Sequence, residues 1–492
     1  MKILEFYNKV DNSVGVAKIL FNYLSQKYPS KKVKDIAKTT SGGTPNRSMS
    51  VYYGGNISWI KSGELNDSII TVSEETITED ALKNSSAKLY PKGTLVLALY
   101  GATVGKTGIL GFESASNQAV CAVYPEKGIS KEYLFWFFRQ KRLEYIQQSF
   151  GGAQPNISQD VVKNTDVPVP PLDVQESVQK LLFHIEKTKR VMDVEGYTAI
   201  IPQLKEFILT KEGYDTIREV YIEDFELISQ LRQSILQEAV SGKIVPQNPK
   251  DESASELLKK IKSERQKLIN EGKIRKEKQL SPISEDDIPY QLPKGWEWVR
   301  LGDLGETQTG TTPSTTKSEY FGGIIPFIKP ADICPNGINY SNGSLTEEGL
   351  NQGRLIPPDS LMMVCIGGST GKSYYSDRDC SCNQQINTIK GLCGLSGKFL
   401  FYFTASPYFQ GRVWTQSTGS ATNIINKQKW ASIPFPLPPL SEQRCIIEKV
   451  DQLMKLCDEL EAKIKENQTN SELLMEAVLK EAFESNVSLS KV

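Results

Sequence analysis

The chain contains one domain twice, and this repeat constrains its fold more than any other feature of the sequence. At an offset of 268 residues, Ser41–Pro45 aligns with Thr309–Pro313, and Tyr53–Lys61 aligns with Phe321–Lys329. After a two-residue deletion the offset is 266, and the matched positions are Leu89, Gly101, Gly105, Lys106, Asn117 and Gln118 with Leu355, Gly367, Gly371, Lys372, Asn383 and Gln384. Most other aligned residues differ, so we expect two copies that share a fold and present different surfaces.

A long helix is expected after each copy of the domain. Apolar residues recur there at alternating intervals of three and four, which is the heptad pattern of a coiled coil. The expected seam residues are Val178, Leu182, Ile185, Ile228, Leu231 and Ile235 in the first helical region and Ile446, Val450, Leu453, Leu460 and Ile464 in the second. The two regions are predicted to form a spacer.

The first helical region is 25 residues longer than the second. The additional segment, near residues 193–220, contains Gly196, Pro202 and Gly213, which predict an interruption of the helix. We expect this insert to form a side lobe that leaves Val178 and Ile228 on one continuous bundle.

Two further segments lie outside the repeat. Residues 1–30 precede the first copy and include a helical pattern from Val16 to Tyr28. Between the copies, Ser255–Lys278 is rich in Lys, Arg and Glu, with apolar residues at helical spacing. Such a charge run predicts a solvated, weakly amphipathic helix rather than a binding site. A proline-marked connector follows it, from Ser281 to Pro293.

The composition is that of an ordinary soluble globular protein. Fifty-eight Lys and Arg balance 58 Asp and Glu, and 39% of the residues are hydrophobic. A net charge of zero argues against binding to nucleic acid through bulk phosphate neutralisation alone, but it allows locally basic faces. The longest strongly apolar run, Tyr133–Phe138, is far shorter than the roughly 20 residues of a membrane helix. The N-terminus is too polar for a signal peptide, so we expect a cytoplasmic protein.

Three features invite a catalytic or metal-binding interpretation, and each is better explained otherwise. Gly101–Thr107 and Gly367–Ser373 resemble phosphate-binding loops, but only three residues separate their glycines where a P-loop needs four. A tight turn whose lysine contacts a phosphate backbone fits better than a P-loop nucleotidase. Cys365, Cys380, Cys382 and Cys393 lack the usual spacing of a zinc site. The single histidine, His184, has no second ligand or catalytic partner nearby in the sequence.

Polar loops at matching places in both copies are the best candidates for function. They are rich in Thr, Ser, Asn and Gln, whose side chains bond base edges or phosphates, and they are accompanied by lysines. The DNA-binding candidates are Thr44, Asn46, Arg47, Lys61, Lys106, Asn117, Gln118, Gln154 and Asn156 in the first copy and Thr312, Ser314, Lys317, Lys329, Lys372, Asn383, Gln384, Thr422 and Asn423 in the second. We predict neither catalytic residues nor a metal site.

Taken together, these motifs resemble the DNA specificity (S) subunit of type I restriction–modification systems, the HsdS family. The resemblance rests on the motifs above, on the helix entries Pro170–Gln175 and Pro438–Gln443, and on Leu231–Lys243 leading to Pro293–Trp298. It covers about residues 31–485. It implies a mixed α/β fold with two target-recognition domains joined by two long antiparallel helices. The expected domains are an N-terminal helical extension (1–30), recognition domain 1 (31–171), a spacer region with the insert (172–247), a charged linker (248–292), recognition domain 2 (293–439) and a C-terminal spacer helix (440–485).

The resemblance also implies a function. Each recognition domain would read one half of a bipartite DNA target, and the chain would assemble with two methyltransferase (M) subunits and with restriction (R) subunits. S-adenosylmethionine, ATP and Mg²⁺ would be bound by those partners, and no cofactor by this chain. A free-standing two-domain DNA-binding regulator is the main alternative.

Overall fold

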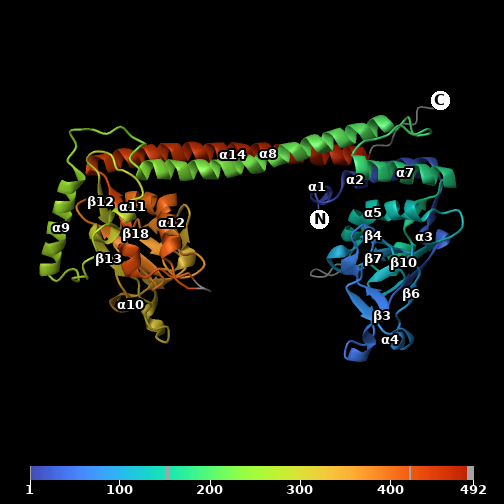
Figure 1. Cartoon of the computed structure of the whole chain (residues 1–492), viewed down its shortest axis with the longest axis horizontal. Coiled ribbons are helices and arrows are strands. Elements are labelled where there is room, and N and C mark those ends of the chain that lie inside the picture. Colours follow the sequence, from blue (N-terminus) through green and yellow to red (C-terminus); the bar gives the residue numbers. More distant parts are fainter. Residues whose placement is uncertain (1, 150–155, 420–422, 485–492) are drawn as a thin grey trace. The chain divides into compact units, whose positions relative to one another are not determined.

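The computed structural model describes residues 2–149, 156–419 and 423–484, which form two compact units. Unit 1 comprises Met1–Tyr221 together with Glu466–Val492, and unit 2 comprises Ile222–Lys465. Each unit contains one copy of the repeat and one part of each long helix (Figure 1).

The core of unit 1 is a five-stranded sheet of order β2-β10-β7-β8-β4. Its strands are β2 (Ala37–Ser41), β10 (Val120–Pro125), β7 (Leu95–Ala98), β8 (Thr107–Leu110) and β4 (Ser68–Ile70). A second sheet has the order β5-β3-β9-β6, from Glu75–Ile77, Tyr53–Ile60, Ser114–Ser116 and Leu89–Tyr90. The short strands β1 (Ser30–Lys32) and β11 (Asp166–Pro168) pair with each other. The all-apolar β7 is buried along its whole length, as expected of a central strand.

Unit 2 repeats this arrangement. Its main sheet has the order β13-β21-β18-β19, formed by Gly305–Thr309, Ile386–Gly391, Ser360–Val364 and Ser373–Tyr375. A second sheet, β17-β14-β20, consists of Ser344–Leu345, Phe321–Ile328 and Ser381–Cys382, while β12 (Glu297–Arg300) pairs with β22 (Pro434–Leu437). Ser41 pairs with Cys121 in unit 1, and Thr309 pairs with Asn387 in unit 2, so the register matches the sequence offsets of 268 and 266. The predicted repeat and mixed α/β fold are confirmed.

Helices complete each unit. In unit 1, α2 (Asn12–Lys27), α5 (Lys131–Gln148) and α7 (Leu172–Thr188) pack on one another, and α5 also contacts β7 and β8. The shorter helices of this unit are α1 (Ile3–Tyr7), α3 (Val33–Ile36), α4 (Glu79–Lys83) and α6 (Gln159–Lys163). In unit 2 they are α10 (Glu347–Gln352), α11 (Gly397–Ala405), α12 (Pro407–Gln416) and α13 (Lys427–Ala431). Residues 3–7 and 12–27 of the predicted N-terminal extension are therefore helical, and their apolar faces lie in the core of unit 1.

The linker helix α9 (Ala254–Asn270) packs within unit 2. Ala254, Leu257, Leu258 and Ile261 are buried in the unit's hydrophobic core, and their charged neighbours face outward. The predicted amphipathic helix is present and most of its charged side chains are exposed, but its apolar face is buried in the core of the unit. A stripe of apolar residues along one face is enough to attach an otherwise charged helix to a core.

The long helices are α8 (Ile201–Val240) and α14 (Leu440–Glu484), and they correct the predicted spacer. Helix α7 ends at Thr188, followed by Lys189 in a left-handed conformation (φ 59°), and α8 then runs without interruption through Pro202 and Gly213. Most of the insert therefore forms the first half of a spacer helix and no side lobe. The predicted continuous bundle was wrong, because Val178 lies on α7 in unit 1 and Ile228 on α8 in unit 2.

Two sequence features explain this difference. Pro202 occupies the first turn of α8, where a missing backbone N–H has no helical partner to lose. Gly213 costs about 1 kcal/mol relative to alanine, which packing of the buried side chains Phe207 and Tyr214 offsets. The predicted seam residues Val178, Leu182 and Ile185 are buried, but on α7 against the core of unit 1.

The remaining seam residues lie in unit 2, where the C-terminal part of α8 runs along the N-terminal part of α14. Ile228, Ile235, Ile446 and Val450 are buried, and Leu453 and Ile464 are partly buried. Leu231 and Leu460 are 45% and 52% exposed, so their placement in the seam was wrong. A single partner helix covers only a narrow strip of each helix, so apolar residues at the side of that strip stay exposed. Next to Leu231, Arg232 reaches across to α14 and pairs with Asp458 (2.7 Å) and Glu461 (3.0 Å).

The last part of α14 completes unit 1. Met475 and Leu479 are buried in the same core as α2 and α7. Asn22 Nδ2 donates to the backbone carbonyl of Phe483 (2.6 Å), and the Phe483 ring packs against Tyr7 at 4.8 Å between centroids. The core of unit 1 is thus built from the beginning and the end of the described chain.

Gly213→Ala tests the continuity of α8. Gly213 is exposed, and nothing lies within 4 Å of the position of an added Cβ, so alanine should stabilise the helix by about 0.5–1 kcal/mol. Urea unfolding followed by circular dichroism measures this change. Gly196→Ala is the control and should destabilise, because Gly196 has φ +84° in the turn before α8. A loss of stability in Gly213→Ala would contradict an uninterrupted helix.

Candidate nucleic-acid interface

The polar loops of unit 1 leave the same edge of its main sheet. Strand β2 ends at Ser41 beside Cys121, and Ala98 at the end of β7 pairs with Val120 at the start of β10. The Leu99 N–H donates to the Ala119 carbonyl (2.7 Å). Three loops, 42–50, 99–106 and 117–119, are therefore brought together although up to 77 residues separate them. Residues 156–157 join them, since the Ile157 N–H donates to the Leu99 carbonyl (2.9 Å).

Unit 2 builds the same arrangement with the same backbone bonds. The Cys365 N–H donates to the Gln385 carbonyl (2.7 Å), and the Ile425 N–H donates to the Cys365 carbonyl (2.9 Å). We call these loop clusters the polar edges: 42–50, 99–106, 117–119 and 156–157 in unit 1, and 310–318, 365–372, 383–385 and 423–425 in unit 2. They bring together most of the candidates that the sequence predicted.

Two glycines allow the first loop of each polar edge to approach the sheet. A Cβ at Gly42 would lie 2.2 Å from the backbone oxygen of Ser116, and a Cβ at Gly310 would lie 2.2 Å from that of Asn383. Both contacts are with backbone, which cannot move aside as a flexible side chain could. The Gly42 N–H donates to the Val120 carbonyl (3.2 Å). Glycine is therefore required for the loop to fold back against the strands.

One side-chain hydrogen bond recurs in both polar edges. Thr44 Oγ1 donates to Gln118 Oε1, and at the matching positions Thr312 Oγ1 donates to Gln384 Oε1 (2.5 Å). Both glutamines are exposed. Fixing the amide oxygen in this way orients the Nε2 group as a preorganised donor and lowers the entropic cost of a further contact.

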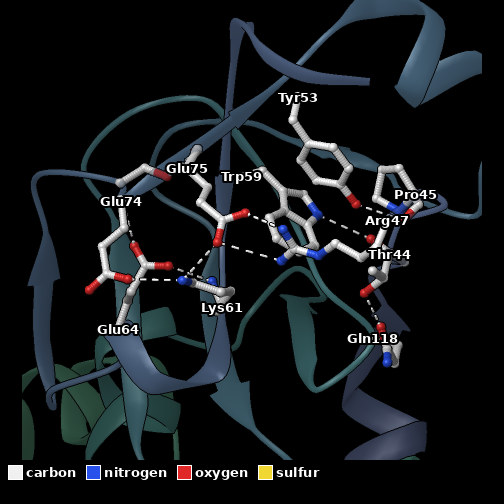
Figure 2. Close-up of polar contacts among 12 residues, drawn as sticks. Thr44, Pro45, Arg47, Tyr53, Trp59, Lys61, Glu64, Glu74, Glu75 and Gln118 are labelled. Atoms are coloured by element: carbon white, nitrogen blue, oxygen red, sulfur yellow. Dashed lines mark hydrogen bonds and ion pairs between the residues drawn. The ribbon is translucent and has the colours of Figure 1, made fainter. Parts of the chain in front are cut away.

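Arg47 and Lys61 of unit 1 converge on one carboxylate. Arg47 pairs with Glu75 (2.7 Å), and Lys61 pairs with Glu75 (3.0 Å) and Glu74 (2.9 Å). Figure 2 shows Arg47 beside the rings of Tyr53 and Trp59, whose centroids lie 4.7 and 5.0 Å from its guanidinium carbon. The hydrogen bonds from Arg47 and Lys61 lower the pKa of the Glu75 carboxyl, and Glu74 and Glu75 together balance the charge of the two cations.

The cations of unit 2 are arranged differently. The counterpart of Lys61 is Lys329, which is exposed and makes no ion pair within the described residues. At the offset of 268 the position of Glu75 is taken by Gly343, which has no charge. Lys317 donates to the Tyr320 hydroxyl (3.2 Å). In the turns, Lys106 and Lys372 likewise make no ion pair with any part of the chain that the structure describes.

Several candidates hold the loops themselves. Asn117 and Asn383 accept hydrogen bonds from the backbone N–H two residues later, at 3.2 and 3.1 Å, and Asn46 does the same for Ser48 (3.1 Å). Asn383 is only 9% exposed, so its amide serves the turn rather than an external ligand. The Asn423 carbonyl accepts from Gly367 N–H (3.0 Å).

Four further candidates are either surface residues of the polar edges or lie outside the described residues. Asn156 is exposed, and its backbone forms an isolated antiparallel β-bridge with Tyr100. The Ser314 hydroxyl shares a hydrogen bond with the Thr316 hydroxyl (2.9 Å). Gln154 and Thr422 lie outside the described residues.

The glycine–lysine turns are hairpins and not phosphate-binding loops. Gly101–Thr103 is a single 3₁₀ turn that connects β7 to its antiparallel neighbour β8, and Lys106 directly precedes that strand. A P-loop requires a helix at this point, where backbone N–H groups would cradle the phosphate. Among the described residues, no group of three or more His, Cys, Asp or Glu side chains is arranged to hold a metal ion. Burial raises the pKa of Cys365 and of Cys380 to about 12, as expected of unreactive core thiols.

Sequence patterns alone missed two parts of this surface. The first is the pairing of Arg47 and Lys61 with Glu75, because no spacing rule connects residues on different strands. The second is Lys88, which donates to Thr40 Oγ1 (2.5 Å) beside the first loop. The repeat contained a signal for it, since Lys88 aligns with Arg354 at the offset of 266 and both residues are cationic.

Comparison with known proteins identifies the family. The model of the "Type I restriction modification DNA specificity domain" matches residues 26–193 and 293–468. The chain is 29% identical over 377 residues to the type I restriction enzyme EcoAI specificity subunit of Escherichia coli, covering 68% of this chain and 62% of that protein. It is 26% identical over 304 residues to the MjaIX specificity subunit of Methanocaldococcus jannaschii, covering 61% and 56%. The matches thus span about three fifths of these relatives.

The fold has a solved counterpart. A chain of a type I R-M system aligns with a TM-score of 0.50 and 16% identity, covering 93% of this chain and 97% of the other. Each matched region of the family model contains one main sheet and one polar edge. The chain belongs to the type I restriction modification DNA specificity domain family.

Proposed function

We propose that this chain is the DNA sequence-specificity subunit of a type I restriction–modification complex, and that each unit reads one half of a bipartite target. The observation that carries the proposal is the occurrence of the same polar edge, built by the same backbone hydrogen bonds, in both units. One reading surface repeated on two domains suits a target of two separate parts.

The side chains of the polar edges suit DNA. A glutamine amide can bond adenine through two atoms in the major groove, and Gln118 and Gln384 are exposed and held by threonines. Lysine at Lys106, Lys329 and Lys372 suits phosphate contacts, which position a protein on the duplex without reading sequence. The two units differ at other loop positions, such as Asn46 and Arg47 in unit 1 against Ser314 and Thr315 in unit 2, which supports different half-sites.

The chain also carries surfaces that suit partner subunits. Exposed apolar residues lie on the long helices of both units, and the sequence likeness of Ile235–Val240 to Val478–Phe483 relates them at an offset of 243. At this offset exposed Leu231 matches exposed Leu474, and exposed Ile217 matches exposed Leu460. Leu231 and Leu460 lie in unit 2, and Ile217 and Leu474 lie in unit 1. We propose that each of these two sites receives an apolar helix of one methyltransferase subunit, with restriction subunits joining the assembled complex.

In this proposal the chain itself performs no chemistry. S-adenosylmethionine, ATP and Mg²⁺ belong to the methyltransferase and restriction subunits, and the complex acts on DNA in the cytoplasm. No helix within the described residues is both long and apolar enough to span a bilayer.

Deletion of the gene tests the function. Methylome sequencing of the host with and without the gene should show the loss of one bipartite methylation motif, and the gene restored on a plasmid should bring it back. An unchanged methylome would contradict the proposal and favour a free-standing DNA-binding regulator.

Glu75→Gln tests the orientation of the polar edge. Removing this carboxylate releases Arg47, while Lys61 keeps its ion pair with Glu74, so binding of the full chain to duplex DNA should strengthen, and its logarithmic salt dependence should steepen by about one. Glu79→Gln removes a more exposed charge outside the cluster and serves as the control. Weaker binding by Glu75→Gln would show that Arg47 does not face the phosphates.

The exposed leucines test the assembly. Leu231→Glu combined with Leu460→Glu should lower the affinity of unit 2 for the methyltransferase subunit by about tenfold or more, because a buried anchor would be replaced by a charge. Analytical ultracentrifugation of the mixture should then show one tightly bound methyltransferase subunit in place of two. Gln233→Glu places the same charge on α8 and should leave both bound. Full assembly by the double variant would refute the docking site.

A further inference from the structure

Unit 2 contains a strongly charged cavity that the polar edges do not explain. It has a volume of about 330 Å³, near the lower limit of about 300 Å³ for small-molecule sites. One wall is the end of α9 with the linker that follows it, and the other is strand β13 with Arg354 from a neighbouring loop and Lys427 from the start of α13. The lining side chains that carry charge are Arg265, Lys273, Arg275, Glu277, Glu306, Arg354 and Lys427.

The linker wall is fixed to the sheet by specific contacts. Thr307 Oγ1 of β13 donates to Glu277 Oε2 (2.9 Å), and Lys427 pairs with the other oxygen of the same carboxylate. Arg265 on α9 pairs with Asp303 (3.5 Å) and Glu277 (3.7 Å). Because α9 is also anchored by its buried apolar face, the cavity has two walls of defined position.

The balance of charge in this cavity is positive. Five cationic side chains face two carboxylates, and one of these carboxylates, that of Glu277, already bonds Thr307 and Lys427. Arg275 and Arg354 make no ion pair within the described residues. Burial, with repulsion from Glu277, raises the pKa of the Glu306 carboxyl.

The repeat shows which part of the cavity is new. In unit 1, Lys88 contacts Thr40, and Gln159 Nε2 donates to Thr39 Oγ1 (2.9 Å). The matching residues of unit 2 are Arg354, Gln308, Lys427 and Thr307. A cation beside this end of the strand is therefore common to both units. The linker wall is not, because the segment before the first repeat, α2, packs on α5 and α7 instead.

We propose that this cavity is a phosphate-binding site, in which Arg275 and Arg354 hold the anionic oxygens. Guanidinium groups match phosphate through paired N–H donors, and an exposed arginine without a carboxylate partner is free to make this contact. The phosphate belongs either to the backbone of DNA bound by this chain, which rests on the proposed function, or to a free phosphorylated molecule.

The test compares the full chain with the variant Arg275→Gln/Arg354→Gln in two titrations. The first uses inorganic pyrophosphate as the probe, and the second uses duplex DNA over a series of salt concentrations. Both arginines are exposed, so the substitutions leave the core unchanged, and a thermal melt verifies this. The control Lys259→Gln/Lys260→Gln removes two charges from the outer face of α9, where both lysines pair with glutamates.

A DNA phosphate is identified if the logarithmic salt dependence becomes shallower by about one in the arginine variant and not in the control. A free phosphorylated ligand is identified if pyrophosphate binding weakens by about tenfold or more while the DNA titration stays unchanged. If the arginine variant matches the control in both titrations, the site is refuted. Loss of the bipartite methylation motif on gene deletion tests the proposed function separately, since it does not depend on these arginines.

Discussion

The close approach of one loop to the sheet determines the candidate surface of each unit. Gly42 and Gly310 lie where a Cβ would collide with a backbone oxygen. This close contact places the loop after β2 against the turn before β10 in unit 1, and the loop after β13 against the turn before β21 in unit 2. This placement brings Thr44 within hydrogen-bond distance of Gln118, and Thr312 within hydrogen-bond distance of Gln384, next to the glycine–lysine turn of each unit. A fold that fixes its loops by backbone contacts can change exposed side chains without losing its frame, which is what two divergent copies require.

Much of this arrangement could be predicted from the sequence. The repeat, the strand before each glycine–lysine turn and the polar loops all have local signals, and the structure brings these loops to one sheet edge. The spacer was less predictable. A heptad pattern does not reveal where one helix ends and the next begins, so Val178 was assigned to the wrong helix. Gly213 and Pro202 suggested a break because propensity is a weak preference that packing and position override.

The two polar edges share geometry and differ in electrostatics. In unit 1 the ion pairs of Glu75 reduce the field of Arg47 and Lys61, whereas Lys329 of unit 2 has no such partner. No sequence rule gives this difference, because the carboxylate comes from a separate strand. A chain with zero net charge can therefore contain one cationic surface whose charge is offset by carboxylates and a second cationic surface whose charge is not.

The two units also differ in how the chain supplies them. Unit 2 is one contiguous segment, whereas the core of unit 1 needs Met475 and Leu479 from the end of α14. During synthesis, unit 2 therefore has all its residues before unit 1 does, although unit 1 begins first. Until α14 emerges, the apolar faces of α2 and α7 lack part of their cover. Of the two units, the one whose translation starts earlier is thus the last to become complete, and the risk of aggregation is greatest while its core is exposed.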